Sequence, residues 1–366
     1  MRVLVTGSEG FIGKNLISKL SERDDVEIIS FNRNNTVEEL TSKLDKIDFV
    51  FHLAGVNRAS GKDEFQLGNV CLSEILVKAI MACERKPRVL FASSSQASLD
   101  NDYGRSKMDA EMAFGKAVSE GLNVEIIRLP NVFGKWCKPN YNSVVATFCH
   151  NVAIGKPIEI HNEQTVLDLI YIDDVISGFL DILDQTATTK FLIDAQVYKK
   201  TIKEVAELLY RFKDIKNSLG IGQVGTGFER ALYSTFLTYL PLDDFSYLIP
   251  KHSDSRGDFV EMLKTSSSGQ FSYFTAHPGV IRGGHYHHSK TEKFLVLSGS
   301  ARFRFRHIIS EEYLEIFTEG GEPRVVETIP GWAHDITNIG EDNLIVMLWA
   351  NEIFDPAQTD TVERLI

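Results

Sequence analysis

Short apolar runs alternate with helix-period segments over the first 130 residues of the chain. RVLVTG (residues 2–7), VEIISFN (26–32) and DFVFHLAG (48–55) are typical of buried strands, whereas residues 11–20 and 72–84 have helical periodicity. The same alternation continues with strands predicted at 88–95 and 123–129 and a helix predicted at 104–120. Strands that alternate with helices predict βαβ units and a doubly wound, Rossmann-type α/β sheet.

After about residue 245 the pattern changes to short β segments that are separated by Gly, Pro and Asn turns. The segments are FSYFTAHPG (271–279), EKFLVLSGSARFRFRHI (292–308), VVETIPGWAH (325–334) and NLIVMLWA (343–350). This pattern favours an all-β sandwich or barrel. We therefore expect an α/β domain over residues 1–244 and an all-β domain over residues 245–366.

Composition limits the classes of partner. The chain has 366 residues and a formal net charge of −11, so we expect no nucleic-acid partner. The four cysteines form no C-x-x-C pair, which is typical of reduced thiols in an intracellular protein. No signal-peptide pattern opens the chain, and no apolar run approaches the ~20 residues that span a bilayer. We therefore expect a cytoplasmic protein with no membrane partner.

The turn after the first predicted strand carries three glycines, Gly7, Gly10 and Gly13, in the sequence TGSEGFIG. Small residues at this turn let the backbone approach a pyrophosphate, whose charge the following helix N-terminus favours. The region after the second strand, SFNRNNT, has Arg33 where an acid usually contacts the ribose of NAD. Because arginine suits a 2′-phosphate, we expect NADPH as the cofactor.

Tyr103 and Lys107 have the Y-x-x-x-K spacing that puts both side chains on one face of a helix. A nearby ammonium lowers the pKa of a phenol from its usual value of about 10, so we expect Tyr103 to be a usable acid at neutral pH. The serines of SSSQ end the preceding predicted strand, where their hydroxyls can hydrogen-bond the same substrate carbonyl.

With these motifs, residues 1 to about 240 resemble an extended short-chain dehydrogenase/reductase. The resemblance places the catalytic hydroxyl at Ser95, with Ser94 as the alternative, and it makes Tyr103 the proton donor or acceptor and Lys107 its partner. It also implies that Asn131 contacts a nucleotide-sugar. The implied cofactor-binding residues are Gly7, Gly10, Phe11, Ile12, Gly13, Asn32, Arg33, Leu53, Ala54, Gly55, Tyr103 and Lys107.

A second group of chemically active residues lies in GVIRGGHYHHSKTEKFLVLSG (279–299). His285 and His287 alternate along a strand, so they point to the same face, whereas His288 points away. Glu292 follows, and His334 lies downstream in PGWAHDITN. Three imidazoles and one carboxylate make a plausible site for a divalent first-row metal ion, and we expect zinc.

The spacing of these residues resembles the two sequence motifs of the cupin family, which implies a cupin (jelly-roll) barrel with His285, His287, Glu292 and His334 as metal ligands. GVIRGGHY and DSRGDF also resemble sugar-nucleotide 3,5-epimerases. That resemblance implies that Arg256 and Arg282 meet the diphosphate of the substrate and that His285 is the base. A metal-bound imidazole nitrogen cannot also take a proton. We favour the ligand role for His285 because the other three residues complete a set.

Taken end to end, the chain resembles bifunctional capsular polysaccharide enzymes in which an extended reductase is fused to an epimerase-like cupin. The implied substrate is a UDP-linked 2-acetamido-2,6-dideoxy-4-hexulose, which is epimerised at carbon 3 and reduced at carbon 4. Relatives of both folds imply a homodimer. The alternative is a non-catalytic protein that senses NADP(H) and sugar, but a sensor needs no proton relay of the kind that Tyr103 and Lys107 predict.

Overall fold

The computed structural model describes residues 1–59, 61, 63–185, 197–254, 257–260, 262–263, 269–352 and 359–366. These residues form two compact units. Unit 1 contains residues 1–144 and 166–200, and unit 2 contains residues 145–165 and 201–366. Residues 201–244 therefore pack with the strand-rich part of the chain, although the sequence pattern places the boundary at residue 244. The boundary at residue 244 stays a prediction of where the reductase part of the chain ends and the metal-binding part begins.

Unit 1 is built on a five-stranded parallel sheet of order β2-β1-β3-β4-β5. Its strands are β1 (Arg2–Thr6), β2 (Glu27–Phe31), β3 (Phe49–His52), β4 (Arg88–Ser94) and β5 (Val124–Leu129). Its helices are α1 (Phe11–Leu20), α2 (Val37–Leu44), α3 (Leu72–Ala82), α4 (Asp102–Ser119) and α6 (Ile172–Leu183). A smaller sheet contains β6 (Asn131–Phe133), β7 (Val166–Tyr171) and β8 (Tyr198–Thr201). The predicted Rossmann-type sheet is confirmed.

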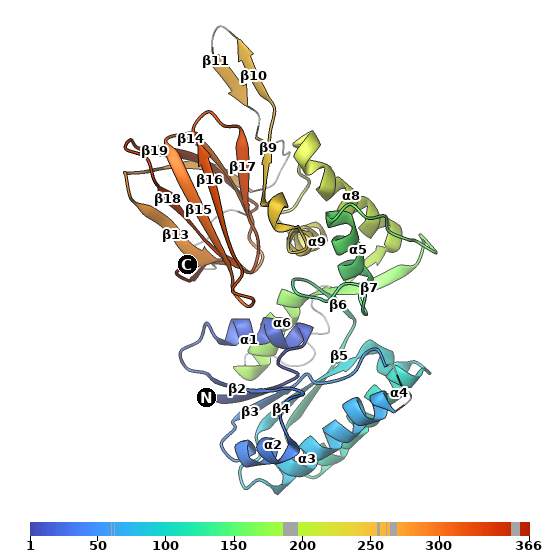
Figure 1. Cartoon of the computed structure of the whole chain (residues 1–366). Coiled ribbons are helices and arrows are strands. Elements are labelled where there is room, and N and C mark those ends of the chain that lie inside the picture. The colour runs from blue at the N-terminus through green and yellow to red at the C-terminus, as the bar shows by residue number, and fades with distance from the viewer. Residues whose placement is uncertain are drawn as a thin grey trace. The chain divides into compact units, whose positions relative to one another are not determined.

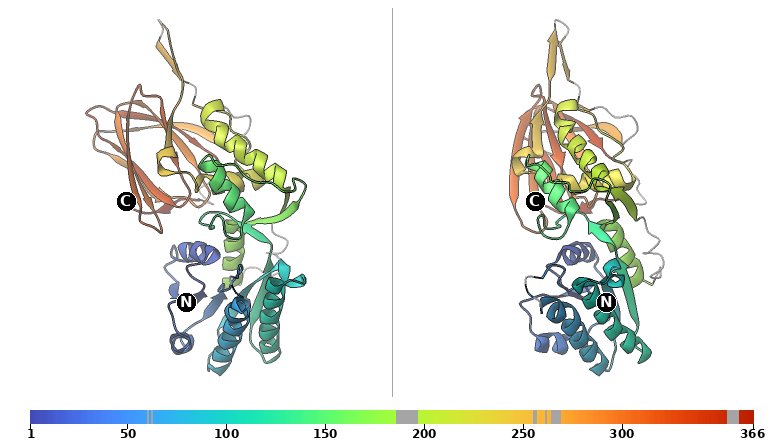
Figure 2. Two further views of the ribbon diagram at one scale, coloured as in Figure 1. Left: turned by 45° about the vertical axis from the view of Figure 1, so that its right-hand side comes forward. Right: turned by 90° about the vertical axis from the view of Figure 1, so that its right-hand side faces the viewer.

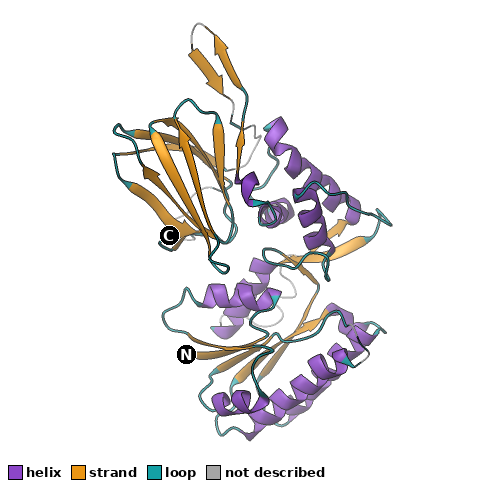
Figure 3. Ribbon diagram, viewed as in Figure 1, coloured by secondary structure: helices purple, strands orange, loops and turns teal. Residues whose placement is uncertain are grey.

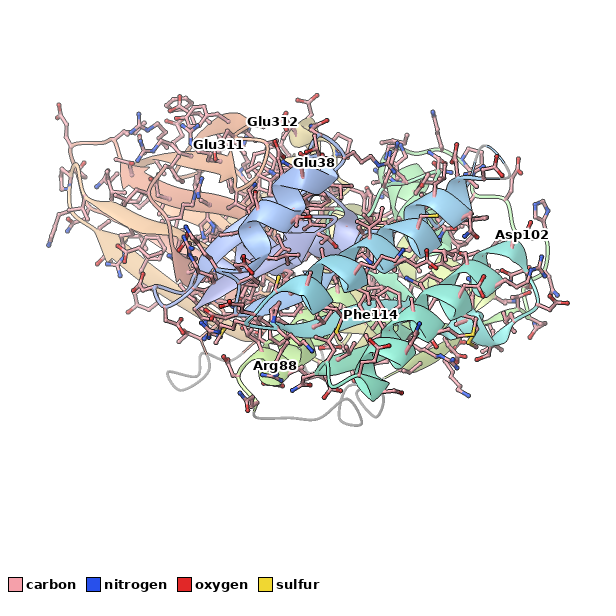
Figure 4. The ribbon with its side chains drawn as sticks, turned by 90° about the horizontal axis from the view of Figure 1, so that it is seen from below. Glu38, Arg88, Asp102, Phe114, Glu311 and Glu312 are labelled. Atoms are coloured by element: carbon pink, nitrogen blue, oxygen red, sulfur yellow. The ribbon has the colours of Figure 1, made fainter. Side chains whose placement is uncertain are left out.

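The helices of unit 1 cover both faces of the sheet. α1 and α6 lie on one face, and α2, α3 and α4 lie on the other (Figures 1 and 2). Figure 4 shows the second layer from below, with Phe114 on α4 labelled. The Phe114 ring is buried and lies 4.8 Å from the ring of Phe91 on β4, centroid to centroid. Apolar packing of this kind fixes α4, and therefore Tyr103 and Lys107, against the sheet.

Unit 2 is dominated by strands, which are orange in Figure 3 and pair antiparallel. One sheet has the order β12-β19-β14-β17-β9 and the other β16-β15-β18-β13-β20. Their strands are β9 (Ser246–Leu248), β12 (Gln270–Ala276), β13 (Ile281–Tyr286), β14 (Glu292–Ser298), β15 (Ser300–His307), β16 (Tyr313–Glu319), β17 (Arg324–Thr328), β18 (Trp332–Asn338), β19 (Leu344–Ala350) and β20 (Val362–Glu363). Two five-stranded antiparallel sheets confirm the expected all-β fold class.

The remaining elements of unit 2 are mainly helical. They are α5 (Val144–Ala153), α8 (Ile202–Ser218), α9 (Gly227–Leu237), the 3-10 turn Leu242–Phe245, and the hairpin of β10 (Lys251–Asp254) and β11 (Gly257–Val260). α8 and α9 pack on each other through the rings of Phe212 and Tyr233, whose centroids are 5.0 Å apart. α9 also reaches the strands, because the Ser234 hydroxyl donates to the backbone oxygen of Ser289 at 2.8 Å.

Alternation along β14 places two neighbouring charges on opposite faces of its sheet. Glu292 is grouped with the histidines, whereas Lys293 forms an ion pair with Glu327, its cross-strand neighbour on β17. All three side chains are buried. A shift of the strand by one residue would exchange the environments of Glu292 and Lys293, so the two buried charges together specify the register of β14.

Candidate active sites

The turn between β1 and α1 fits a dinucleotide. Gly7 has a φ of 68°, and a Cβ atom there would lie 2.7 Å from the backbone nitrogen of Ala54. A Cβ atom on Gly13 would lie 2.2 Å from the backbone oxygen of Gly7. Only glycine leaves these backbones close together at the carboxyl ends of β1 and β3, which is the geometry that a pyrophosphate needs beside a helix N-terminus. Phe11 and Ile12 open α1 at this turn, and Leu53 and Gly55 flank Ala54 after β3.

The turn after β2 holds Asn32 and Arg33 at the same edge of the sheet. Arg33 is exposed. The Asn32 side-chain amide donates to the Glu9 carboxylate at 2.8 Å, and its oxygen accepts from the backbone N–H of Asn34 at 2.9 Å. The sequence pattern did not identify Glu9, because this acid comes from the glycine turn and not from the end of β2. The edge therefore offers a cofactor both an exposed guanidinium and a carboxylate.

The hydroxyl that hydrogen-bonds Tyr103 is that of Ser94, the alternative to the predicted Ser95. Ser94 ends β4 and hydrogen-bonds the Tyr103 side chain, whereas Ser95 is exposed and begins a 3-10 turn (Ser95–Ser98). The Ser94 oxygen also accepts from the backbone N–H of Gln96 at 3.1 Å, which caps that turn. The end of β4 separates the two serines, because Ser94 is the last residue of the strand and Ser95 is the first residue of the turn.

The pKa of Tyr103 also differs from the expectation. Burial raises the pKa of the Tyr103 hydroxyl, and the hydrogen bond with Ser94 only partly opposes that rise. Lys107 was expected to lower this pKa. Instead the Lys107 ammonium donates to the backbone oxygen of Ala92 at 2.8 Å and lies over the Phe91 ring, 4.4 Å from its centroid. Burial lowers the pKa of Lys107 to about 8, although the nearby Glu111 carboxylate raises it.

A buried hydrogen-bond network centred on His52 lies beneath this site. The Thr6 hydroxyl accepts from the backbone N–H groups of Leu53 and Ala54, both at 3.2 Å, so its proton goes to Nδ1 of His52 at 2.8 Å. The Nε2–H of His52 then donates to the Ser73 hydroxyl at 3.0 Å. Burial lowers the pKa of His52 to about 3, with a smaller contribution from the Lys107 charge, so the ring is neutral. This hydrogen-bond network fixes the loop after β3, on the side of the sheet where the cofactor is expected.

Asn69 extends this network to α4. Its side-chain amide donates to the backbone oxygen of Val56 and to the Ser106 hydroxyl, both at 2.9 Å, and its oxygen accepts from Val56 N–H at 2.7 Å. The Ser106 hydroxyl in turn donates to the backbone oxygen of Tyr103 at 2.8 Å. Sequence reasoning missed Asn69, because its partners lie up to 37 residues away and no local spacing marks it.

The three residues expected to bind substrate have different surroundings. Asn131, on β6, is exposed and donates to the backbone oxygen of Asp168 at 3.2 Å. Arg282, on β13, is exposed, lies over the Phe274 ring at 5.0 Å and donates to the backbone oxygen of Thr275 at 3.3 Å. Arg256 lies outside the described residues. Substrate contacts of these residues stay predictions.

The four expected metal ligands do come together in unit 2. The ligand atoms of His285, His287, Glu292 and His334 all lie within 4.8 Å of one another. Oε2 of Glu292 is 3.3 Å from Nε2 of His287 and 3.4 Å from Nε2 of His334. Ligands held about 2.1 Å from one ion at tetrahedral angles lie about 3.4 Å apart, so these donors fit a single divalent cation. His288 is not in the group, and its ring packs on Tyr286.

The protonation states of this group suit a cation. Burial, together with the neighbouring His334 and His287, lowers the pKa of His285 to about 3, and burial also lowers that of His334. Burial raises the pKa of Glu292, but hydrogen bonds from His287 and His334 outweigh it and hold that pKa well below 4.5. At neutral pH the imidazoles of His285 and His334 are therefore neutral and the Glu292 carboxylate is ionised, as metal ligation requires.

Two further polar residues adjoin the group and were missed by sequence reasoning. Nζ of Lys290 is 3.3 Å from Oε1 of Glu292, the oxygen not directed at the imidazoles. The backbone oxygen of Asp360 accepts from Nδ1 of His287, which leaves the Nε2 lone pair available to bind a cation. Lys290 lies within the histidine-rich segment and could have been noticed, whereas Asp360 is 73 residues from His287.

The glycine turn and the Ser–Tyr–Lys set on a Rossmann-type sheet are typical of a nucleotide-dependent reductase or epimerase. Comparison with known families agrees. The chain belongs to the NAD dependent epimerase/dehydratase family, whose model matches residues 3–193. Residues 252–362 match the polysaccharide biosynthesis C-terminal domain. An NAD(P)-dependent N-terminal half and a polysaccharide-synthesis C-terminal half are therefore combined in one chain.

Two of the particular relatives cover the chain from end to end. It is 51% identical over 365 residues to a UDP-2-acetamido-2,6-beta-L-arabino-hexul-4-ose reductase of Pseudomonas aeruginosa, over 99% of this chain and 98% of that protein. It matches the crystal structure of the capsular polysaccharide assembling protein CapF from Staphylococcus aureus over all of both chains, with a TM-score of 0.68 and 40% identity. It is also 27% identical over 120 residues to the spore coat polysaccharide biosynthesis protein SpsL of Bacillus subtilis, over 30% of this chain and 80% of that protein. The resemblance to capsular polysaccharide enzymes is confirmed.

Within the described part of the chain, every helix is too short or too polar to cross a bilayer.

The low pKa of Lys107 predicts how stability changes with pH. The folded, cofactor-free protein releases this proton near pH 8 and the unfolded chain near 10.5, so the unfolded state binds more protons in between. The free energy of unfolding should therefore rise with pH in this window, by up to about 3 kcal/mol between about pH 8 and pH 10. Chemical denaturation of the wild type and Lys107→Met at several pH values isolates this effect. Parallel curves of the free energy of unfolding against pH for the two proteins would contradict this prediction.

Proposed function

We propose that the chain catalyses two successive reactions on one UDP-linked 2-acetamido-2,6-dideoxy-4-hexulose. The C-terminal residues epimerise carbon 3, and the N-terminal residues reduce the 4-keto group to give UDP-2-acetamido-2,6-dideoxy-L-talose. The observation that carries the proposal is the full-length similarity to a reductase of a hexul-4-ose. The Ser94–Tyr103–Lys107 set and the three-histidine, one-glutamate group support one site for each reaction.

The reduction uses a buried phenol as acid. NADPH, when bound, supplies the hydride to carbon 4. Tyr103 gives its proton to the carbonyl oxygen, and its raised pKa keeps that proton in place at neutral pH until the oxygen gains charge. Ser94 hydrogen-bonds the same hydroxyl and is placed to hold the substrate oxygen. Lys107 supplies positive charge on the next turn of the same helix.

The epimerisation uses the same ketone. A carbonyl at carbon 4 acidifies the proton on carbon 3, because the resulting charge is delocalised onto the oxygen. We propose zinc as the cation that His285, His287, Glu292 and His334 hold, and when bound it supplies positive charge beside that oxygen. The homodimer and the cytoplasmic location stay predictions.

The two sites should be separable by mutation. Tyr103→Phe removes the proton donor of the reductase and leaves the histidine group unchanged. In deuterated water this variant should exchange the proton on carbon 3 of the 4-keto sugar while NADPH stays unoxidised. His334→Ala should lose the exchange but still reduce substrate that was epimerised beforehand. Proton NMR of the sugar ring and the absorbance of NADPH measure the two reactions.

The same experiment can refute the division of labour. Loss of exchange in Tyr103→Phe would mean that the reductase site also moves the proton on carbon 3. Reduction of the unepimerised sugar at the full rate by His334→Ala would mean that epimerisation does not precede reduction.

Ser94 and Ser95 form a matched pair of variants for the reductase. Ser94→Ala should lower the rate of reduction by about 10²-fold, because it removes the hydroxyl that hydrogen-bonds Tyr103. Ser95→Ala changes an exposed side chain and should leave the rate within about twofold. Steady-state rates of reduction with saturating NADPH measure both effects. A large loss in Ser95→Ala and none in Ser94→Ala would identify Ser95 as the catalytic serine.

We propose NADPH, and not NADH, on the basis of Arg33, which is exposed at the end of β2. Arg33→Ala should weaken NADPH binding by about 10-fold or more and leave NADH binding unchanged, because a charge-assisted hydrogen bond to phosphate is lost. Titration of both cofactors into both proteins measures this. Equal affinities for the two cofactors in the wild type would contradict the preference.

A further inference from the structure

The loop between β13 and β14 carries functional groups of the metal site but forms no regular secondary structure. It contains His287, whose Nε2 lies beside Glu292, and Lys290, whose ammonium lies beside the other oxygen of Glu292. A loop of this kind needs partners for its backbone N–H groups. Three consecutive N–H groups of the loop have the same partner, the carboxylate of Asp360.

The Asp360 carboxylate receives four hydrogen bonds from the loop. Oδ1 accepts from the backbone N–H of His288 at 2.8 Å. Oδ2 accepts from the backbone N–H groups of Ser289 at 2.7 Å and Lys290 at 2.8 Å, and from the Ser289 hydroxyl at 3.0 Å. Hydrogen bonds to a carboxylate are charge-assisted and therefore stronger than neutral ones. One side chain thus fixes the path of the loop over three residues.

The main chain of Asp360 acts on a ligand directly. Its carbonyl oxygen accepts from Nδ1 of His287, which sets both the tautomer and the orientation of that ring. The residues that follow run along β13, where His285 pairs with Glu363 and Tyr286 pairs with Val362. The N–H of Arg364 donates to the backbone oxygen of Gly284 at 2.7 Å. The C-terminal segment 359–366 is therefore attached to the strand that carries His285.

We propose that Asp360 is a positioning residue of the metal site: its carboxylate holds the 287–290 loop so that its own carbonyl aligns His287 for the cation. The proposal rests on the metal site of the proposed function. It assigns a role in metal binding to one residue of the C-terminal segment 359–366, which lies outside both histidine motifs.

Asp360→Asn in the full-length chain tests the proposal. The amide keeps the shape of the side chain but replaces one acceptor oxygen with a donor and removes the charge. Affinity for Co²⁺ and Zn²⁺, measured by competition with a chromophoric chelator, should fall by about 10- to 100-fold. The visible absorption spectrum of the Co²⁺ form should change, since a rotated His287 alters the ligand field. A role confined to stability would leave this spectrum unchanged.

Glu363→Gln is the matched control, because Glu363 is an exposed carboxylate in the same C-terminal segment and its side chain makes none of these bonds. It should retain wild-type affinity and spectrum. Wild-type affinity and spectrum in Asp360→Asn would overturn the proposal, as would an equal loss in both variants.

Hydrogen exchange of the metal-free wild type gives an independent measurement if Asp360→Asn does not fold. The amides of His288, Ser289 and Lys290 should be protected, and fast exchange at all three would overturn the proposal. Failure of the proposed metal site is distinguishable, because the wild type would then bind neither cation, whatever the exchange at the loop.

Discussion

The buried carboxylate of Glu292 is the constraint on which the chemistry of unit 2 depends. An ionised carboxylate in a protein interior is unfavourable unless hydrogen bonds or a cation compensate its charge. The Lys290 ammonium at 3.3 Å supplies one compensating charge, and a cation held with the two imidazole nitrogens at 3.3 and 3.4 Å from the carboxylate would supply more. Each of these groups must in turn be held in place. The register of β14, which the Lys293–Glu327 pair specifies on the other face, and the hydrogen bonds to Asp360 both serve this one arrangement.

Unit 1 meets a related problem with a different solution. Its proposed catalytic groups, Ser94 and Tyr103, come from a strand end and from the helix that follows, so packing alone fixes their separation only coarsely. The buried network from Thr6 through His52 and Ser73, continued by Asn69 and Ser106, ties the loop after β3 to the first turn of α4. Because every member is hydrogen-bonded and the imidazole is neutral, the network orders the site without burying an unpaired charge.

Features set by local periodicity were predictable from the sequence, and features set by contacts between distant residues were not. The sequence spacing predicted that His285 and His287 lie together and that His288 does not, and the structure agrees, although β13 ends at Tyr286 and His287 lies in the loop that follows. The sequence could not separate Ser95 from its alternative Ser94, because one residue decides where β4 ends and the 3-10 turn begins, and it is Ser94 that hydrogen-bonds Tyr103. The pKa of Tyr103 could not be inferred from its spacing to Lys107, since burial dominates the shift. Asp360 and Asn69 act through partners far along the chain, which leave no local pattern.

The chemistry of a ketone explains why two unrelated folds would be of use in one chain. Removing the proton on carbon 3 gives the same enolate from either epimer, so epimerisation is reversible and leaves a mixture whose composition the catalyst cannot change. Hydride transfer to carbon 4 destroys the ketone and with it the acidity of that proton. Reduction of one epimer therefore draws the mixture forward and fixes both stereocentres in a single product. A single chain that carries both sites supplies them in equal number, so the site for the reversible step is always accompanied by the site for the irreversible one.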